Sequence, residues 1–60
     1  YTLNDLIRFC KMNALSFELC FHESDSSWHL LLQSPSGEYH SGKQFTLENA
    51  IKRVKELYDN

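Results

Sequence analysis

The hydrophobic periodicity of this 60-residue chain changes twice, and that change constrains the fold more than any other feature. Apolar residues first recur at helical spacing, at Leu3, Leu6, Ile7, Cys10 and Ala14. They then alternate with polar residues, and the helical spacing returns at Leu47, Ala50, Ile51, Val54, Leu57 and Tyr58. A period of about 3.6 is typical of an amphipathic helix, and a period of two is typical of a half-buried strand. The sequence therefore predicts helical segments at both ends and strands between them.

Both predicted helices begin with residues suited to helix starts. Thr2 is a good N-cap, and Asp5 lies three positions further on, as in a capping box. Thr46 opens the last segment, and Glu48 stands in its first turn, where the helix dipole favours a negative charge. We expect one helix over residues 3–14 and a second one after Thr46.

Three strands are predicted in the middle of the chain, separated by short polar turns. They cover residues 16–23, 28–33 and 38 to about 44, and Gly42 weakens the third. The first turn is the serine-rich stretch 24–27, and the second contains Pro35 and Gly37, two residues that favour tight turns. Because connections this short join neighbouring antiparallel strands, the sequence predicts an antiparallel meander.

The apolar faces of these elements determine how they assemble. One face of the sheet carries Phe17, Leu19, Phe21, Trp28, Leu30 and Leu32. Both helices would bury their apolar stripes on that face and leave the other face open. We therefore expect residues 1–60 to form a single α+β domain, αβββα, with two helices packed on one face of a three-stranded antiparallel sheet.

The open face of the sheet depends on strand register. A four-residue loop at 24–27 would pair Glu23 with Trp28, which sets His22 opposite His29 and Cys20 opposite Leu31. A two-residue turn at Pro35–Ser36 would set His40 opposite Leu31. A bulge at Gly37 is the alternative, and it would turn Tyr39 outward in place of His40. Both orientations of the third strand stay open at this point.

A mixed patch results on this face, and it is the predicted partner-binding site. Its residues are Cys20, His22, His29, Leu31 and His40. Cysteine and histidine also bind zinc, but zinc sites usually show tighter paired spacing, so we expect no metal site and no cofactor. A polar-rimmed apolar patch is typical of protein contact surfaces. The sequence therefore favours protein binding here.

Charge and composition restrict the remaining functions. The formal charge of −2 and the pI of about 5.8 argue against a general nucleic-acid binder. Two cysteines without paired spacing indicate reduced thiols in a cytoplasmic protein, and no apolar run is long enough for a membrane span. No catalytic motif surrounds any serine or cysteine, and no glycine-rich phosphate loop is present. We therefore expect a protein that is not an enzyme.

The predicted order of elements, over the whole chain, resembles the double-stranded RNA-binding domain. That family contacts RNA partly through a Gly-Pro-x-His loop and a Lys-Lys-x-Ala-Lys helix start. Here the loop reads Ser24-Asp25-Ser26-Ser27, and only Ala50 matches the helix motif, so the resemblance covers the topology and not the RNA contacts. The function it implies, nucleic-acid binding, would use a basic strip of Lys43, Lys52, Arg53 and Lys55.

The run Leu3-Asn4-Asp5-Leu6-Ile7-Arg8, followed by a meander and a helix, resembles small anti-CRISPR proteins of phages and mobile elements. This resemblance implies an inhibitor or modulator that docks onto a host protein such as a CRISPR effector. A homodimer through an edge strand or the open sheet face is the other expected assembly.

Overall fold

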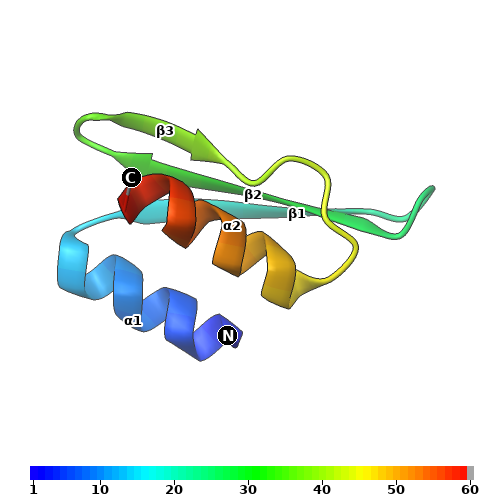
Figure 1. Cartoon of the computed structure of the whole chain (residues 1–60), viewed down its shortest axis with the longest axis horizontal. Coiled ribbons are helices and arrows are strands. Elements are labelled where there is room, and N and C mark those ends of the chain that lie inside the picture. The colour runs from blue at the N-terminus through cyan, green and yellow to red at the C-terminus, as the bar shows by residue number, and fades with distance from the viewer. Residues whose placement is uncertain (60) are drawn as a thin grey trace.

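A computed structural model describes residues 1–59 and shows the expected order of elements (Figure 1). The elements are α1 (Leu3–Asn13), β1 (Ser16–His22), β2 (Ser27–Ser34), β3 (Gly37–His40) and α2 (Leu47–Asp59). The strands form one antiparallel sheet in the order β1-β2-β3, and both helices lie on the same side of it. The predicted α+β class and αβββα order are confirmed. Residue 60 of the predicted domain lies outside the described residues.

Helix α1 has defined residues at both ends. The Asp5 backbone N–H donates to Thr2 Oγ1 over 3.3 Å, and the Thr2 N–H donates to the Asp5 carboxylate over 2.9 Å. This is the expected capping box, and it satisfies donors that the first turn leaves free. Ala14 ends the helix in the left-handed region, with φ of 55°, and the Leu15 N–H closes back on the Cys10 carbonyl at 2.9 Å.

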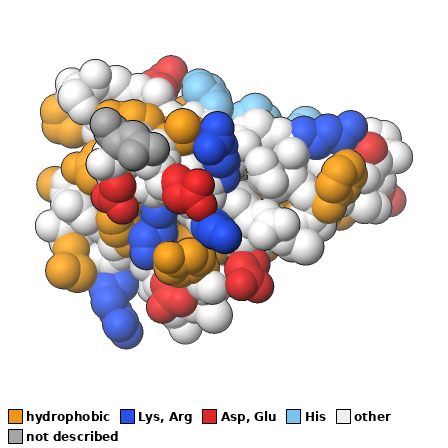
Figure 2. Space-filling model, viewed as in Figure 1, with side chains coloured by type: hydrophobic (Ala, Val, Ile, Leu, Met, Phe, Trp, Pro, Cys, Tyr) orange, Lys and Arg blue, Asp and Glu red, His pale blue; other side chains and the backbone are white. Residues whose placement is uncertain are grey.

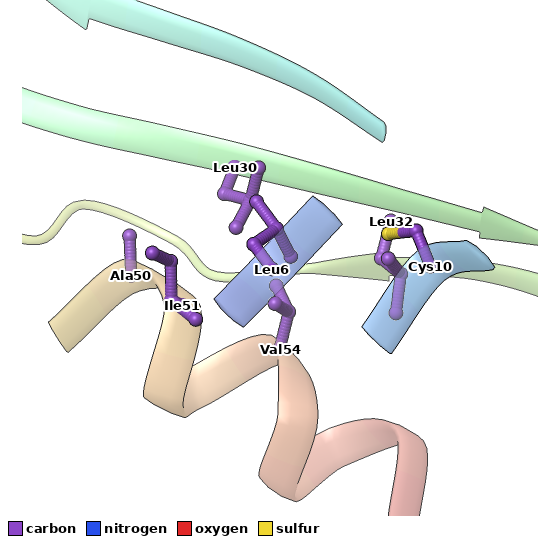
Figure 3. Packing of buried hydrophobic residues seen from close by; sticks show 7 residues of the cluster. All are labelled: Leu6, Cys10, Leu30, Leu32, Ala50, Ile51 and Val54. Carbon is purple, nitrogen blue, oxygen red and sulfur yellow. The ribbon is translucent and has the colours of Figure 1, made fainter. Parts of the chain in front are cut away.

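The core lies between α1, α2 and the inner face of β2 (Figure 3). Its buried members are Leu6, Cys10, Leu30, Leu32, Ala50, Ile51 and Val54. All of them except Cys10 are 0% exposed. Full burial of one such large apolar side chain stabilises a fold by about 1.5–3 kcal/mol, so the alternate residues of β2 that face the helices hold the two layers together.

One expected inner-face residue is not covered by the helices. Phe21 is 50% exposed, although it has the inward orientation and stacks against Trp28 with ring centroids 4.7 Å apart. The β1–β2 hairpin extends beyond the helices (Figure 1), and Phe21 lies near its tip. The prediction that helices would cover all six inner-face positions is therefore wrong at this end.

The register between β1 and β2 differs from the predicted one by two residues. Cys20 pairs with His29, Phe21 with Trp28 and His22 with Ser27. The Asp25 carboxylate accepts hydrogen bonds from the Ser27 N–H at 3.2 Å and from the Ser27 hydroxyl at 2.6 Å. These bonds fix Ser27 as the first residue of β2 and leave Glu23 in the turn. A shift of two residues preserves the faces, because side chains alternate with a period of two.

The register between β2 and β3 is the predicted one. Leu31 pairs with His40 and Leu32 with Tyr39, through a turn that pairs Ser34 with Gly37. His40 therefore points outward, and Tyr39 points inward against Tyr58, with ring centroids 5.6 Å apart. This resolves the two orientations that the sequence left open.

The third strand is shorter than predicted, because it ends at His40. Pairing resumes once, between Trp28 and Gln44, so three steps along β2 correspond to four steps from His40 to Gln44. The extra residue is accommodated around Gly42, whose φ of +69° is left-handed. This bulge changes the alternation, and Phe45 is 68% exposed as a result.

Candidate functional site

The outer face of the sheet is arranged in rows of side chains that run across the three strands. The row nearest the β2–β3 turn is polar and consists of Ser16, Gln33 and Glu38. The Ser16 hydroxyl donates to Gln33 Oε1 over 3.1 Å, and Gln33 Nε2 donates to Glu38 Oε2 over 3.4 Å. Because these groups bond to one another, this row forms a polar border of the site.

The next rows surround a shallow hollow of about 220 Å³. Leu31 lies between Glu18 and His40 in one row, and Cys20 lies opposite His29 in the next. The lining consists of Glu18, Cys20, His22, His29, Leu31 and His40. All five predicted partner-binding residues line this hollow together, and Glu18 completes it. The histidines emerge along the upper edge in Figure 2, where Figure 1 places the sheet.

The closest polar contact in the hollow joins two histidines. His29 Nε2 lies 3.4 Å from His40 Nδ1, and the two rings meet edge to face with centroids 5.6 Å apart. The other ring nitrogen of His40, Nε2, lies 3.9 Å from Glu38 Oε1. The His40 ring thus lies between a carboxylate on its own strand and an imidazole on β2.

The predicted pairing of His22 with His29 is wrong, as is that of Cys20 with Leu31. His22 stands opposite Ser27, at the end of the hollow nearest the β1–β2 turn, and Cys20 stands opposite His29. The cause is the Asp25 turn described above, which moves β1 by two residues relative to β2. His22 still lines the hollow, because the shift preserves the face.

Metal ligation by a complete set of protein groups is not seen. Within residues 1–59, no three histidine, cysteine, aspartate or glutamate side chains converge in a way that could hold a metal ion. Both cysteines are free thiols, with Cys10 buried and Cys20 exposed. Burial raises the pKa of the Cys10 thiol. Over the same residues, no serine or cysteine side chain is hydrogen-bonded to a histidine, as an activated nucleophile would be.

The four cations of the predicted basic strip lie in different settings. Lys43 Nζ contacts the Asp25 carboxylate at 2.7 Å, and this bond, helped by Ser27, lowers the pKa of Asp25 to about 2. Lys55 Nζ lies over the rings of Tyr1 and Phe9, at 4.3 and 5.1 Å from their centroids. These contacts join residues far apart in the chain, so no local sequence pattern predicts them.

Lys52 and Arg53 do lie together, beside a hollow of about 200 Å³ near the start of α2. The Arg53 guanidinium is 4.0 Å from the Glu56 carboxylate, one turn further along the helix. An acidic group therefore lies within this part of the strip, which reduces its attraction for phosphate. Nucleic-acid binding through the strip stays a prediction.

The outer side of α1 is a surface that the sequence did not single out. Met12 is 78% exposed there, and it lines two shallow hollows of about 320 and 370 Å³ together with Arg8. The available signal was the position of Met12 off the apolar stripe, since an exposed methionine is adaptable in binding. This surface lies on the helical side of the domain, away from the open sheet face.

Comparisons of the chain with protein-family models, with curated proteins and with solved structures found no match. The resemblances to double-stranded RNA-binding domains and to anti-CRISPR proteins therefore stay predictions. Within residues 1–59, neither helix combines the length and the apolar character that crossing a membrane requires.

Proposed function

We propose that this domain is a non-enzymatic binding module that docks onto a partner protein through the outer face of its sheet. The observation that carries the proposal is the hollow around Leu31, to which all three strands contribute side chains. Residues on neighbouring paired strands keep fixed spacings, so the surface is already formed before a partner arrives. A surface formed in advance loses little conformational entropy on binding.

The chemistry of the hollow suits a protein partner. Its floor is the half-buried Leu31, with the exposed Cys20 beside it, and its rim consists of Glu18 and the histidines. Protein interfaces commonly combine an apolar centre with a polar rim. Among residues 1–59, Glu18 forms no ion pair, so its carboxylate is available to a cationic or N–H group of the partner.

A test of this proposal compares two substitutions of exposed or half-exposed apolar residues by lysine. Leu31→Lys changes the centre of the hollow, whereas Met12→Lys makes the same kind of change on the outer side of α1. Wild type and both variants are immobilised, incubated with nuclease-treated lysate, and compared for stoichiometric partners. We expect Leu31→Lys to reduce retention of the partner at least tenfold and Met12→Lys to leave it unchanged.

If Met12→Lys reduces retention and Leu31→Lys does not, the binding site lies on α1 and the proposal is overturned. Retention of RNA or DNA in the untreated lysate, with loss of the protein partners after nuclease, would favour the nucleic-acid module instead. In that case binding should weaken steeply with salt, because phosphate contacts release counterions. The narrower function, a phage or mobile-element inhibitor of a host protein, has its support in the sequence resemblance alone.

A further inference from the structure

The distance between the His29 and His40 rings does not suit a hydrogen bond well. A bond donated by nitrogen usually measures about 2.7–3.2 Å between heavy atoms, and His29 Nε2 lies 3.4 Å from His40 Nδ1. In a tetrahedral zinc site, two Zn–N bonds of about 2.0–2.1 Å place their nitrogens about 3.3–3.4 Å apart. The observed separation therefore equals one edge of a metal coordination tetrahedron.

The surroundings of His40 favour the ring state that a metal requires. Its Nε2 lies 3.9 Å from the Glu38 carboxylate, which is too far for a direct hydrogen bond but close enough for electrostatic attraction to favour a hydrogen on Nε2. Nδ1 would then carry a free lone pair on the side of His29. Metal-bound histidines commonly direct their second nitrogen to a carboxylate in this way, which fixes the tautomer and makes the ligand more basic.

The space beside the two rings is open. The His40 side chain is 54% exposed, and both rings line the open hollow on the outer face of the sheet. An ion and its water molecules can therefore reach the pair from solvent. Imidazole ligands select zinc, copper and nickel, whereas magnesium and calcium prefer oxygen ligands.

We propose that His29 and His40 form a two-imidazole binding site for a borderline divalent transition metal ion such as Zn²⁺. Two protein ligands leave the remaining coordination positions to water, which agrees with the absence of a third converging ligand among residues 1–59. Glu38 is a positioning residue that acts through His40. The metal site is a function beyond docking. It needs no partner protein, because this domain supplies both histidine ligands.

The test is calorimetric titration of the isolated domain with Zn²⁺ alone. We expect binding of one ion per chain, weakened at least tenfold by His29→Ala and by His40→Ala. The matched control is His22→Ala, which removes a histidine from the same hollow but from outside the pair, and it should change the affinity less than twofold. Circular dichroism of each variant confirms that the domain is folded.

Two more variants define the ligands. Cys20→Ser should keep the Zn²⁺ affinity within twofold, because His29 Nε2 is directed to β3 whereas Cys20 lies on β1. Glu38→Gln should weaken Zn²⁺ binding less than either histidine variant, and the change should appear in the pH dependence of binding, since the carboxylate no longer fixes the ring of His40.

No Zn²⁺ binding by wild type overturns the proposal. So does an equal loss in His22→Ala, or a loss confined to Cys20→Ser. None of these outcomes depends on a partner protein, so failure of the metal site and failure of the docking surface are separate results.

Discussion

The two faces of β2 carry adjacent residues with opposite roles. Leu30 and Leu32 are 0% exposed and meet both helices, while His29 and Leu31 lie on the face that no helix covers. The inner face is apolar and closely packed, and the outer face presents three histidines, a carboxylate and a thiol around one leucine. This contrast indicates that the buried inner-face residues stabilise the fold, whereas the outer-face residues are available for binding.

The largest difference between the faces should appear when neighbouring leucines are truncated. Leu30→Ala removes a fully buried side chain from the core and should lower the free energy of unfolding by about 2–5 kcal/mol. Leu31→Ala should lower it by less than about 1 kcal/mol, because the half-buried Leu31 has no helix above it. Urea denaturation measures both values, and equal losses would contradict the division of roles.

A smaller effect is expected at a polar group buried on the inner side. Ser41 is 4% exposed, and its hydroxyl accepts from the Leu30 N–H at 2.9 Å and donates to the Gly42 carbonyl at 2.8 Å. Ser41→Ala leaves that N–H without its partner, so we expect a loss of about 1–3 kcal/mol. Ser24→Ala, in the exposed β1–β2 turn, is the matched control and should have almost no effect.

Amide exchange provides a second measurement of the same change. The Leu30 N–H should exchange faster in Ser41→Ala than in wild type, because the inner-face bond that protects it is gone. Unchanged exchange at Leu30 would mean that the bulge rearranges to supply another acceptor.

The smallest expected effect concerns the turn that aligns the outer-face rows. The pKa of Asp25 is lowered from 3.8 to about 2 in the folded protein, chiefly by its bond to Lys43. A carboxylate with a depressed folded pKa adds stability above its unfolded pKa, and this stability is lost as the pH falls. Between about pH 4 and pH 2, wild type should therefore lose stability more steeply than Asp25→Asn.

Lys43→Met should flatten the same part of the profile, because it removes the main cause of the shift. Thermal unfolding across this pH range tests both variants. An identical slope in wild type and both variants would show that the turn does not contribute to acid stability.

The sequence predicts which residues share a face better than it predicts which residues stand opposite each other. Alternation assigns Cys20, His22, His29 and Leu31 to the outer face, and a slip of two residues leaves that assignment intact. The serine-rich turn contains no apolar residue to mark where β2 begins. The register therefore depends on the bonds between Asp25 and Ser27, which hydrophobicity does not report.

The third strand shows the same limit. The two-residue Pro35–Ser36 turn predicts that His40 stands opposite Leu31, and this pairing is confirmed. The early end of the strand follows from the bulge at Gly42, and glycine alone does not distinguish a bulge from a weak strand position. The setting of Lys55 over Tyr1 and Phe9 is a tertiary contact between α2 and the N-terminal segment, so no local pattern predicts it.

The unequal burial of the two cysteines has a practical consequence. Cys10 is 5% exposed within the core, and its raised pKa keeps it in the unreactive thiol form. Cys20 is exposed within the hollow, beside Leu31. A maleimide dye should therefore label the native domain at Cys20 alone. Because a partner bound in the hollow should slow this labelling, the rate of Cys20 labelling reports occupancy of the sheet face without any substitution.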